Sequence, residues 1–175
     1  MVVELRVLNL EDGEDIYHML QHMGPGENGF GNSGYGLSYE EFQQYLERNL
    51  KISKGIGLTA NQVPQTMYWL MADGKPLGMG KLREYLTDAL LKMGGHIGYS
   101  IIPSERGKGY GTIMLKELLK EAAKKEIKEV LLTCNEDNIS SKRVIEGNGG
   151  VLENIVDNKC RYWIRNYHYE VLPVK

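Results

Sequence analysis

The chain has 175 residues, of which 42% are hydrophobic and 25% charged, a balance typical of a folded protein and not of a disordered one. Its formal net charge is -2, from 21 Lys and Arg against 23 Asp and Glu, which disfavours a nucleic-acid binder that relies on bulk positive charge. The two cysteines, Cys134 and Cys160, form no CxxC pair, and the four histidines do not cluster with them, so a structural zinc site has no support.

The first residues, MVVELRVLNLEDGED, are partly acidic and contain no apolar run of signal-peptide length. No stretch approaches the roughly 18–20 apolar residues that a membrane span requires. We therefore expect a cytoplasmic protein with free thiols, no membrane or nucleic-acid partner and no metal, although the sequence leaves a disulfide between the cysteines open.

The first half of the chain shows two strand signals and two helix signals. Residues 2–8 alternate as in a strand, and a helix follows from residues 9–12 to about Met23. Residues 24–36 hold six glycines, too many for a helix or the interior of a strand. The next helix begins at Ser38, with Glu41 completing a capping box.

After a loop over residues 51–65, the pattern turns to strands. Residues 66–72 and 78–86 predict a hairpin around Asp73-Gly74, and residues 95–102 predict a third strand that stops at Pro103. Residues 87–93 are ambiguous.

The second half begins with the clearest helix, over residues 112–125, followed by an apolar strand over 129–134. A short helix capped by Asn138 and two closing strands, 151–156 and 161–167, complete the order. These elements predict one α/β domain over residues 1–175, built on a mixed, mostly antiparallel central sheet flanked by helices.

Residues 101–115, IIPSERGKGYGTIML, form a glycine-rich turn between a strand and a helix. Unpaired N–H groups at the start of a helix attract anions, and Gly107, Gly109 and Gly111 let the backbone approach a ligand closely. The positive charges of Arg106 and Lys108 strengthen the prediction of a pyrophosphate site. A plain strand-to-helix connection is the weaker alternative.

Two better-known phosphate motifs fail on single residues. The dinucleotide fingerprint GxGxxG that starts at Gly107 would need glycine at position 112, where the chain has Thr112. A Walker loop would need Ser or Thr after Lys108, where the chain has Gly109.

The segment 106–111, Arg-Gly-Lys-Gly-Tyr-Gly, instead resembles the Arg/Gln-x-x-Gly-x-Gly/Ala signature of the GCN5-related N-acetyltransferases (GNAT). Residues 97–103 look like the fourth strand of that family and residues 129–134 like its fifth. Residues 138–150 look like its Asn-x-x-Ala/Ser helix and the glycine-rich turn after it. The match is strong over about residues 76–156, because four features occur in the family's order.

This resemblance implies acetyl transfer from acetyl-CoA to an amine, in a fold whose fourth and fifth strands splay apart. It implies that the signature amides bind the CoA pyrophosphate and that the pantetheine arm pairs with the end of the fourth strand, with a backbone N–H near Ile102 as oxyanion donor. The cofactor-binding residues carried over in this way are Ile101, Ile102, Arg106, Gly107, Lys108, Gly109, Tyr110, Gly111, Thr112, Asn138 and Lys142. For Asn138 a helix cap is an equally good explanation, and for Lys142 a solvated helix face is the better one.

The catalytic residues depart from the family pattern. Where the family often has a Glu on the fourth strand, the chain has Gly95, and where it often has a Tyr acid, the chain has Ile145. Proton transfer to or from an amine and a thiolate still needs a partner. We consider His96, Glu84 and Tyr85 as bases, although a place at the edge or in the lining of a strand is the better explanation for His96. Tyr99, Tyr162 or water could replace the missing acid, and Cys134 is more simply a buried apolar residue.

The acceptor side is expected in the 24–36 segment, with Phe30 and Tyr35 as acceptor-binding residues and a lid-like role for the loop. Acidic residues that could attract a cationic amine, or merely form a solvated face, are Glu11, Asp12, Glu14, Glu40 and Glu41.

Three functional hypotheses follow. The first is an N-acetyltransferase that moves an acetyl group from acetyl-CoA to a primary amine of a small molecule or peptide within a ternary complex. The second is a non-catalytic sensor or regulatory module that binds CoA or acyl-CoA, and the third is transfer of a longer acyl group. The family resemblance also suggests a homodimer.

Overall fold

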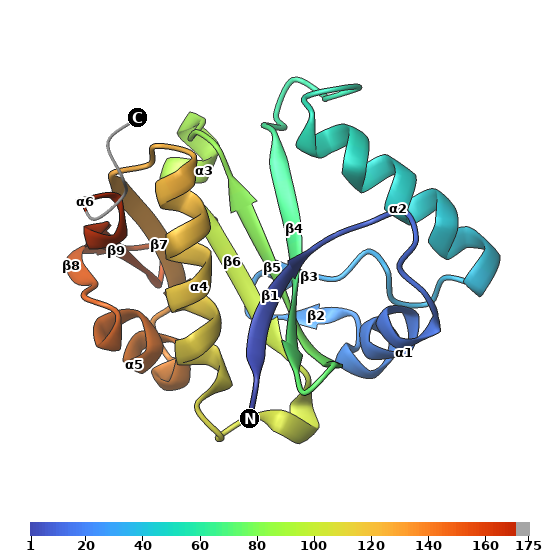
Figure 1. Cartoon of the computed structure of the whole chain (residues 1–175). Coiled ribbons are helices and arrows are strands. Elements are labelled where there is room, and N and C mark those ends of the chain that lie inside the picture. The colour runs from blue at the N-terminus through green and yellow to red at the C-terminus, as the bar shows by residue number, and fades with distance from the viewer. Residues whose placement is uncertain (171–175) are drawn as a thin grey trace.

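A computed structural model describes residues 1–170, which form two larger antiparallel sheets and one two-stranded hairpin, flanked by helices (Figure 1). In the first sheet the strands lie in the order β1 (Val3–Val7), β4 (Gln65–Ala72), β5 (Lys75–Arg83) and β6 (Ile97–Ile101). In the second sheet the order is β7 (Glu129–Asn135), β9 (Lys159–Arg165) and β8 (Val151–Val156).

The helices lie on both sides of these sheets. On one side of the first sheet are α1 (Glu14–Met23) and α2 (Tyr39–Ser53), and on the other is α4 (Tyr110–Lys124), with α5 (Ile139–Gly147) beside it (Figure 1). The shorter helical segments are α3 (Asp88–Lys92), a 3₁₀ turn at Pro103–Glu105 and α6 (Tyr167–Glu170). None of the helices in residues 1–170 has the length and apolarity needed to cross a membrane.

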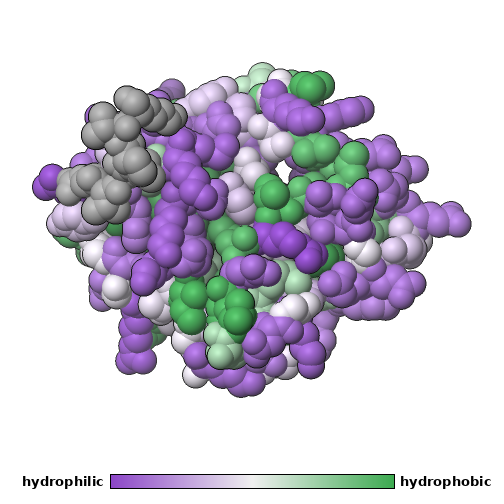
Figure 2. All heavy atoms as spheres, in the orientation of Figure 1, coloured by the Kyte–Doolittle hydropathy of each residue, from purple (hydrophilic) through white to green (hydrophobic). Residues whose placement is uncertain are grey.

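The packing of α4 on the first sheet depends on small residues in β5. A Cβ atom at Gly80 would lie 2.8 Å from Cε of Met114 and 2.9 Å from Cδ1 of Leu118, so only glycine lets the helix come this close. The opposite face of α4 carries the i,i+3 ion pairs Lys120–Glu117 and Lys124–Glu121, and Figure 2 shows hydrophilic side chains over it. This is the amphipathic pattern that the sequence predicts for residues 112–125.

The two sheets meet at β6 and β7, which share no ladder and separate from each other. They are joined only near the start of β6, where the His96 N–H donates to the Leu131 carbonyl (2.8 Å) and the Leu131 N–H donates to Nδ1 of His96 (3.0 Å). The splay of the fourth and fifth long strands, expected from the family resemblance, is therefore confirmed, as is the α/β fold class.

The glycine-rich 24–36 segment is more ordered than the sequence suggests. It contains a short hairpin of β2 (Gly26–Glu27) and β3 (Phe30–Gly31), connected by Asn28 and Gly29, which both have positive φ. Asn-Gly is the residue pair that this tight turn favours. We expected no strand here, because glycine lowers strand propensity and hides the Asn-Gly signal.

Candidate active site

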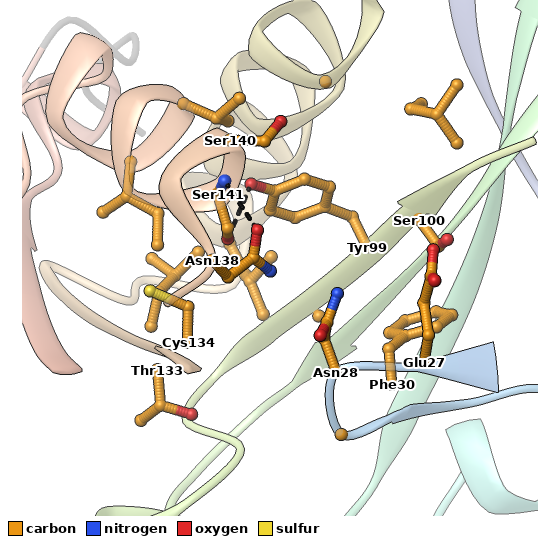
Figure 3. Close-up of a pocket in the computed structure, with 18 of the residues that line it drawn as sticks. Glu27, Asn28, Phe30, Tyr99, Ser100, Thr133, Cys134, Asn138, Ser140 and Ser141 are labelled. Atoms are coloured by element: carbon orange, nitrogen blue, oxygen red, sulfur yellow. Dashed lines mark hydrogen bonds between the residues drawn. The ribbon is translucent and has the colours of Figure 1, made fainter. Parts of the chain in front are cut away.

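A cavity of about 340 Å³ opens where β6 and β7 splay apart. Its wall comes from both strands, from the start of α5, from the loop between β6 and α4, and from the β2–β3 hairpin (Figure 3). The site therefore joins segments that are far apart in the sequence, and it is large enough to hold part of a cofactor and a small acceptor.

One end of the cavity is lined by unpaired backbone amides. Gly107 (φ 77°) and Gly109 (φ 87°) adopt left-handed conformations, and no atom lies within 4 Å of the position that a Cβ would take at either. Within residues 1–170, the N–H groups of residues 107–112 make no backbone or side-chain hydrogen bond. The Arg106 N–H donates to the Pro103 carbonyl (3.4 Å), so the free amides begin at Gly107 and not at Arg106. This cluster at the start of a 15-residue helix suits a diphosphate.

The side chains of this loop are held by ion pairs. Nε of Arg106 donates to the Ile101 carbonyl (3.0 Å), and its guanidinium pairs with Glu27 of the hairpin. Lys108 pairs with Glu105 (2.9 Å) and lies outside the cavity wall. Exposed pairs such as these contribute only about 0–1 kcal/mol, so an incoming phosphate can replace the carboxylates.

The edge of β6 that faces β7 carries backbone N–H groups that are not used in the ladder with β5. The Ile102 N–H donates to the Leu77 carbonyl (2.9 Å), and the register places Ser100 and Gly98 in the same hydrogen-bonded positions toward β5. The N–H groups of Tyr99 and Ile101 alternate with these and point into the splay. Ile102 is thus unavailable as the oxyanion donor that we expected near it.

Some of the other residues predicted to bind the cofactor line the cavity, and others lie outside its wall. Ile101, Tyr110, Gly111, Thr112 and Asn138 line the cavity, whereas Ile102 and Lys142 do not. Oδ1 of Asn138 accepts the Ser141 N–H (3.2 Å) and caps α5, which leaves the amide NH₂ group for a ligand. The cap and the contact with a cofactor are therefore compatible.

The three residues considered as bases all lie off the cavity wall. Glu84 follows the end of β5 and pairs with Lys125 (3.2 Å), and Tyr85 is exposed. His96 is buried at the β6–β7 junction, where Nδ1 accepts a backbone N–H, so a neutral ring carries its proton on Nε2. The geometry gives His96 a part in joining the sheets, which the local sequence pattern could not show.

We expect His96 to make the protein sensitive to acid. Burial, with a smaller effect of Arg83, lowers the pKa of His96 to about 4. In the unfolded chain the pKa is about 6.5, so the unfolded state binds this proton more readily and the free energy of unfolding falls as the pH drops from 6.5 toward 4. From pH 7 to pH 5 the protonation of this group lowers the free energy of unfolding by about 2 kcal/mol. Urea unfolding at both values should show a pH dependence that is smaller in His96→Gln by about this amount. An equal dependence in the two proteins would contradict the buried, neutral ring.

A hydroxyl pair on the cavity wall is the best-placed proton donor. The Tyr99 hydroxyl lies 3.4 Å from Oγ of Ser141, and burial raises the pKa of Tyr99 to about 12, so the phenol stays protonated at neutral pH (Figure 3). Cys134 lies nearby as a free thiol whose pKa burial raises to about 11. The hydroxyl of Tyr162 donates instead to Glu146 (2.7 Å), away from the wall. The Asn-x-x-Ser segment was the sequence signal for Ser141, which we had not singled out.

Another part of the cavity wall lies against the β2–β3 hairpin, in the segment where the sequence predicts the acceptor. Phe30 packs over Gly98, where a Cβ would come within 3.2 Å of the ring, and Nζ of Lys81 lies 4.4 Å from the ring centroid. Tyr35 is exposed and does not line the cavity. Lys81 and Arg83 also line the cavity, and neither is among the site residues that the sequence predicts.

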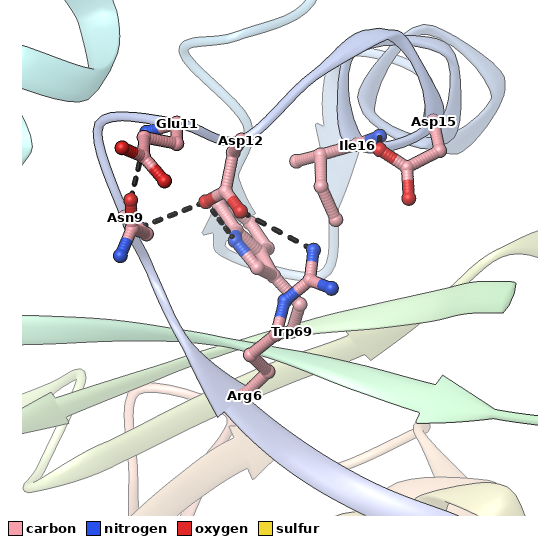
Figure 4. A network of polar contacts seen from close by, with 7 residues as sticks. All are labelled: Arg6, Asn9, Glu11, Asp12, Asp15, Ile16 and Trp69. Atoms are coloured by element: carbon pink, nitrogen blue, oxygen red, sulfur yellow. Dashed lines mark hydrogen bonds and ion pairs between the residues drawn. The ribbon is translucent and has the colours of Figure 1, made fainter. Parts of the chain in front are cut away.

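None of the five acidic residues considered for a cationic acceptor lines this cavity. Asp12 is buried elsewhere, where its carboxylate accepts from Nε1 of Trp69 (2.8 Å) and from the Asn9 N–H (2.8 Å) and pairs with Arg6 (3.2 Å) (Figure 4). Asp12 thereby joins the loop after β1 to β1 and β4, which is a structural role. Within residues 1–170, no group of three His, Cys, Asp or Glu side chains is placed to hold a metal ion.

Comparison with known proteins agrees with this site. The family model described as an acetyltransferase (GNAT) domain matches residues 3–151. A search of curated protein sequences finds no match. Similar solved structures include RimL, a ribosomal L7/L12 alpha-N-protein acetyltransferase in complex with coenzyme A (18% identity, 94% of both chains, TM-score 0.70). They also include the N-acetyltransferase PseH of Campylobacter jejuni with acetyl coenzyme A (11% identity, 94% of this chain and 99% of that one, TM-score 0.63).

A third similar structure is a mutant form of the spermidine/spermine N-acetyltransferase SpeG of Vibrio cholerae (15% identity, 97% of this chain and 98% of that one, TM-score 0.61). At these identities the likeness establishes the fold, while the family model covers most of the sequence. The chain therefore belongs to the GNAT acetyltransferases, enzymes that take their acyl group from acetyl-CoA and need no metal.

Proposed function

We propose that this protein transfers the acetyl group of acetyl-CoA to a primary amine of a small molecule or peptide, by direct attack in a ternary complex. The observation that carries this proposal is the single cavity in which the unpaired amides of residues 107–112 and the open edge of β6 meet. The named activities of RimL, PseH and SpeG, all N-acetyltransferases, support transfer to nitrogen.

The proposed cofactor contacts follow the wall of the cavity. The diphosphate of acetyl-CoA lies on the amides of Gly107 to Thr112, with Arg106 exchanging Glu27 for a phosphate oxygen. The pantetheine arm pairs with the outward backbone groups of Tyr99 and Ile101. Lys108 and Lys142, which lie outside the wall, contribute positive charge at a distance.

Acetyl transfer then needs few groups from the protein. The neutral amine attacks the thioester carbonyl carbon, and an outward N–H of β6 stabilises the oxyanion. The C–S bond breaks, and the CoA thiolate takes the proton of the Tyr99 hydroxyl. The resulting phenolate is reprotonated from water through the Ser141 hydroxyl. The amine proton leaves through water, to which the Glu27 carboxylate, released when Arg106 turns to the phosphate, is open, while Glu105 pairs with Lys108.

Removing the Tyr99 hydroxyl tests this role. In Tyr99→Phe we expect kcat to fall by about 10²-fold, the lower end for a lost general acid, with unchanged affinity for acetyl-CoA. Tyr39→Phe, a change at an exposed phenol on α2, is the matched control and should keep wild-type kcat. Thiol release measured against an amine panel gives both values, and full activity of Tyr99→Phe would assign the proton to water.

The same assay tests the proposed function itself. Binding of acetyl-CoA followed by amine-dependent thiol release is the expected result, and failure to bind acetyl-CoA would contradict the proposal. Tight binding without turnover of any amine would favour the alternative, a non-catalytic CoA-binding module. The positions of His96, Glu84 and Tyr85 off the wall favour that alternative, whereas Tyr99 favours catalysis. Replacing acetyl-CoA by longer acyl-CoA donors tests the third hypothesis.

A homodimer in the cytoplasm remains part of the proposal. All residues of β8, an edge strand, are exposed, including the apolar Val151, Leu152, Ile155 and Val156. An exposed apolar edge is a ready surface for pairing with a second strand. Sedimentation equilibrium would show whether the chain associates.

A further inference from the structure

The charges on the cavity wall are unevenly partnered. Four cations and two carboxylates line the cavity, although the whole chain has a net charge of -2. Both carboxylates pair with cations of the loop between β6 and α4 (residues 102–109), which we call the diphosphate loop: Glu27 pairs with Arg106 and Glu105 with Lys108. Of the four wall cations only Arg106 has a carboxylate partner, and within residues 1–170 Lys81, Arg83 and Lys159 form no ion pair. Lys159, on β9, donates to Oδ1 of Asn135, which leaves Lys81 and Arg83 as the two that stand on one strand.

Lys81 and Arg83 are neighbours on one face of β5, because side chains two positions apart point the same way. Their partners are neutral carbonyls: Lys81 donates to Gly31 (2.7 Å), and Nη1 of Arg83 donates to Gly94 (3.2 Å) and Gly95 (3.1 Å). Burial, with a smaller effect of Arg83, lowers the pKa of Lys81 to about 8. Two adjacent, half-buried cations without a counter-charge are costly, and a bound anion would relieve that cost.

The position of these cations separates them from the diphosphate site. In the register of β5 with β6, Lys81 lies opposite Gly98. Ile101 lies three residues further along β6 and leads into the diphosphate loop. At about 3.3 Å per residue, this places Lys81 about 10 Å from the end of β6. The cations thus belong to the end of the cavity under Phe30, where the acceptor is expected.

We propose that the acceptor is an amine that also carries a carboxylate, and that Lys81 and Arg83 bind this carboxylate while the amine points toward Tyr99. The inference rests on the proposed acetyltransferase function and names its substrate class. A guanidinium and an ammonium side by side suit the two oxygens of a carboxylate. A polyamine would instead place its cations against Lys81 and Arg83, so the geometry disfavours polyamine acceptors.

The test compares amino acids and short peptides with the same compounds whose carboxylate is replaced by an amide. We expect kcat/KM from thiol release to be at least about tenfold higher for the acids, with spermidine a poor acceptor. Calorimetric binding of N-acetylated amino acids and their amides gives the same comparison without turnover. A chain that binds CoA but turns over no amine would refute the proposed function. The calorimetric preference for N-acetylated acids over their amides would still show whether Lys81 and Arg83 bind a carboxylate.

Variants of Lys81 assign the preference to its charge. Lys81→Met should lower kcat/KM for the acids about tenfold or more and leave the amides and the acetyl-CoA affinity unchanged. Lys81→Arg should restore most of the preference for acids, and Lys75→Met, an exposed change at the start of β5, should have no effect. Equal use of acids and amides by the wild-type protein would overturn the proposal. An equal loss for both in Lys81→Met, with a lower Tm, would also overturn it and reduce Lys81 to a support for the hairpin.

Discussion

Replacing Gly109 by Glu is expected to abolish measurable binding of acetyl-CoA. Gly109 has φ 87° and precedes the first residue of α4, at the centre of the free amides. A side chain there costs about 1–3 kcal/mol of backbone strain, and a carboxylate facing a diphosphate adds several kcal/mol of repulsion. The strain lowers stability with or without ligand, whereas the repulsion acts only in the complex and predicts at least about a 100-fold weaker Kd, which isothermal titration calorimetry can measure.

Gly149→Glu is the matched control, because Gly149 has φ 89°, has no atom within 4 Å of a Cβ position and lies off the cavity wall. It introduces the same strain and the same charge, and its affinity for acetyl-CoA should stay within about twofold of wild type. If both variants bind acetyl-CoA as tightly as the wild-type protein, the glycine-rich loop does not hold the diphosphate.

Gly95→Ala is expected to destabilise the fold strongly. Gly95 has φ 63°, and a Cβ would lie 2.3 Å from the Leu131 carbonyl oxygen, at the point where β6 and β7 meet. Strain of about 1–3 kcal/mol and a backbone clash of about 1–3 kcal/mol predict a loss of about 2–6 kcal/mol in the free energy of unfolding. Urea unfolding at pH 7 would measure it.

The control for this variant is Gly57→Ala, since Gly57 has φ 72° and no atom within 4 Å of a Cβ position. It has the strain without the clash, so its loss should be smaller by at least about 1 kcal/mol. Equal losses would show that β6 and β7 can move apart at this point. The same contact explains why no Glu stands at position 95: the Leu131 carbonyl leaves no room for a side chain.

The glycine-rich turn and the helix at one end of the cavity could be predicted, because their signals are local. Three glycines at alternate positions next to Arg106, followed by the regular apolar spacing of Leu115, Leu118 and Leu119, indicate a turn and a helix without knowledge of the rest of the chain. The capping box at Ser38 and the hairpin at Asp73-Gly74 were confirmed for the same reason.

The part of the cavity under Phe30 could not be predicted, because its contacts are long-range. The strand expected over 78–86 ends at Arg83, so Glu84 and Tyr85 follow the last residue of the strand and lie off the cavity wall. Lys81 and Arg83 show the alternation of a strand face, but helices cover both faces of the sheet, and the pattern does not say which face borders the cavity. Nor does any local pattern pair His96 with Leu131 or Glu27 with Arg106.

The most direct test of diphosphate binding is a ¹H–¹⁵N NMR titration that compares acetyl-CoA with S-acetylpantetheine, which has the thioester arm but no diphosphate. Acetyl-CoA should shift the backbone amides of Gly107, Gly109 and Gly111 strongly, together with those of Tyr99 and Ile101. S-acetylpantetheine should shift only the amides of Tyr99 and Ile101. If saturating acetyl-CoA leaves the three glycine amides unmoved, the diphosphate binds elsewhere.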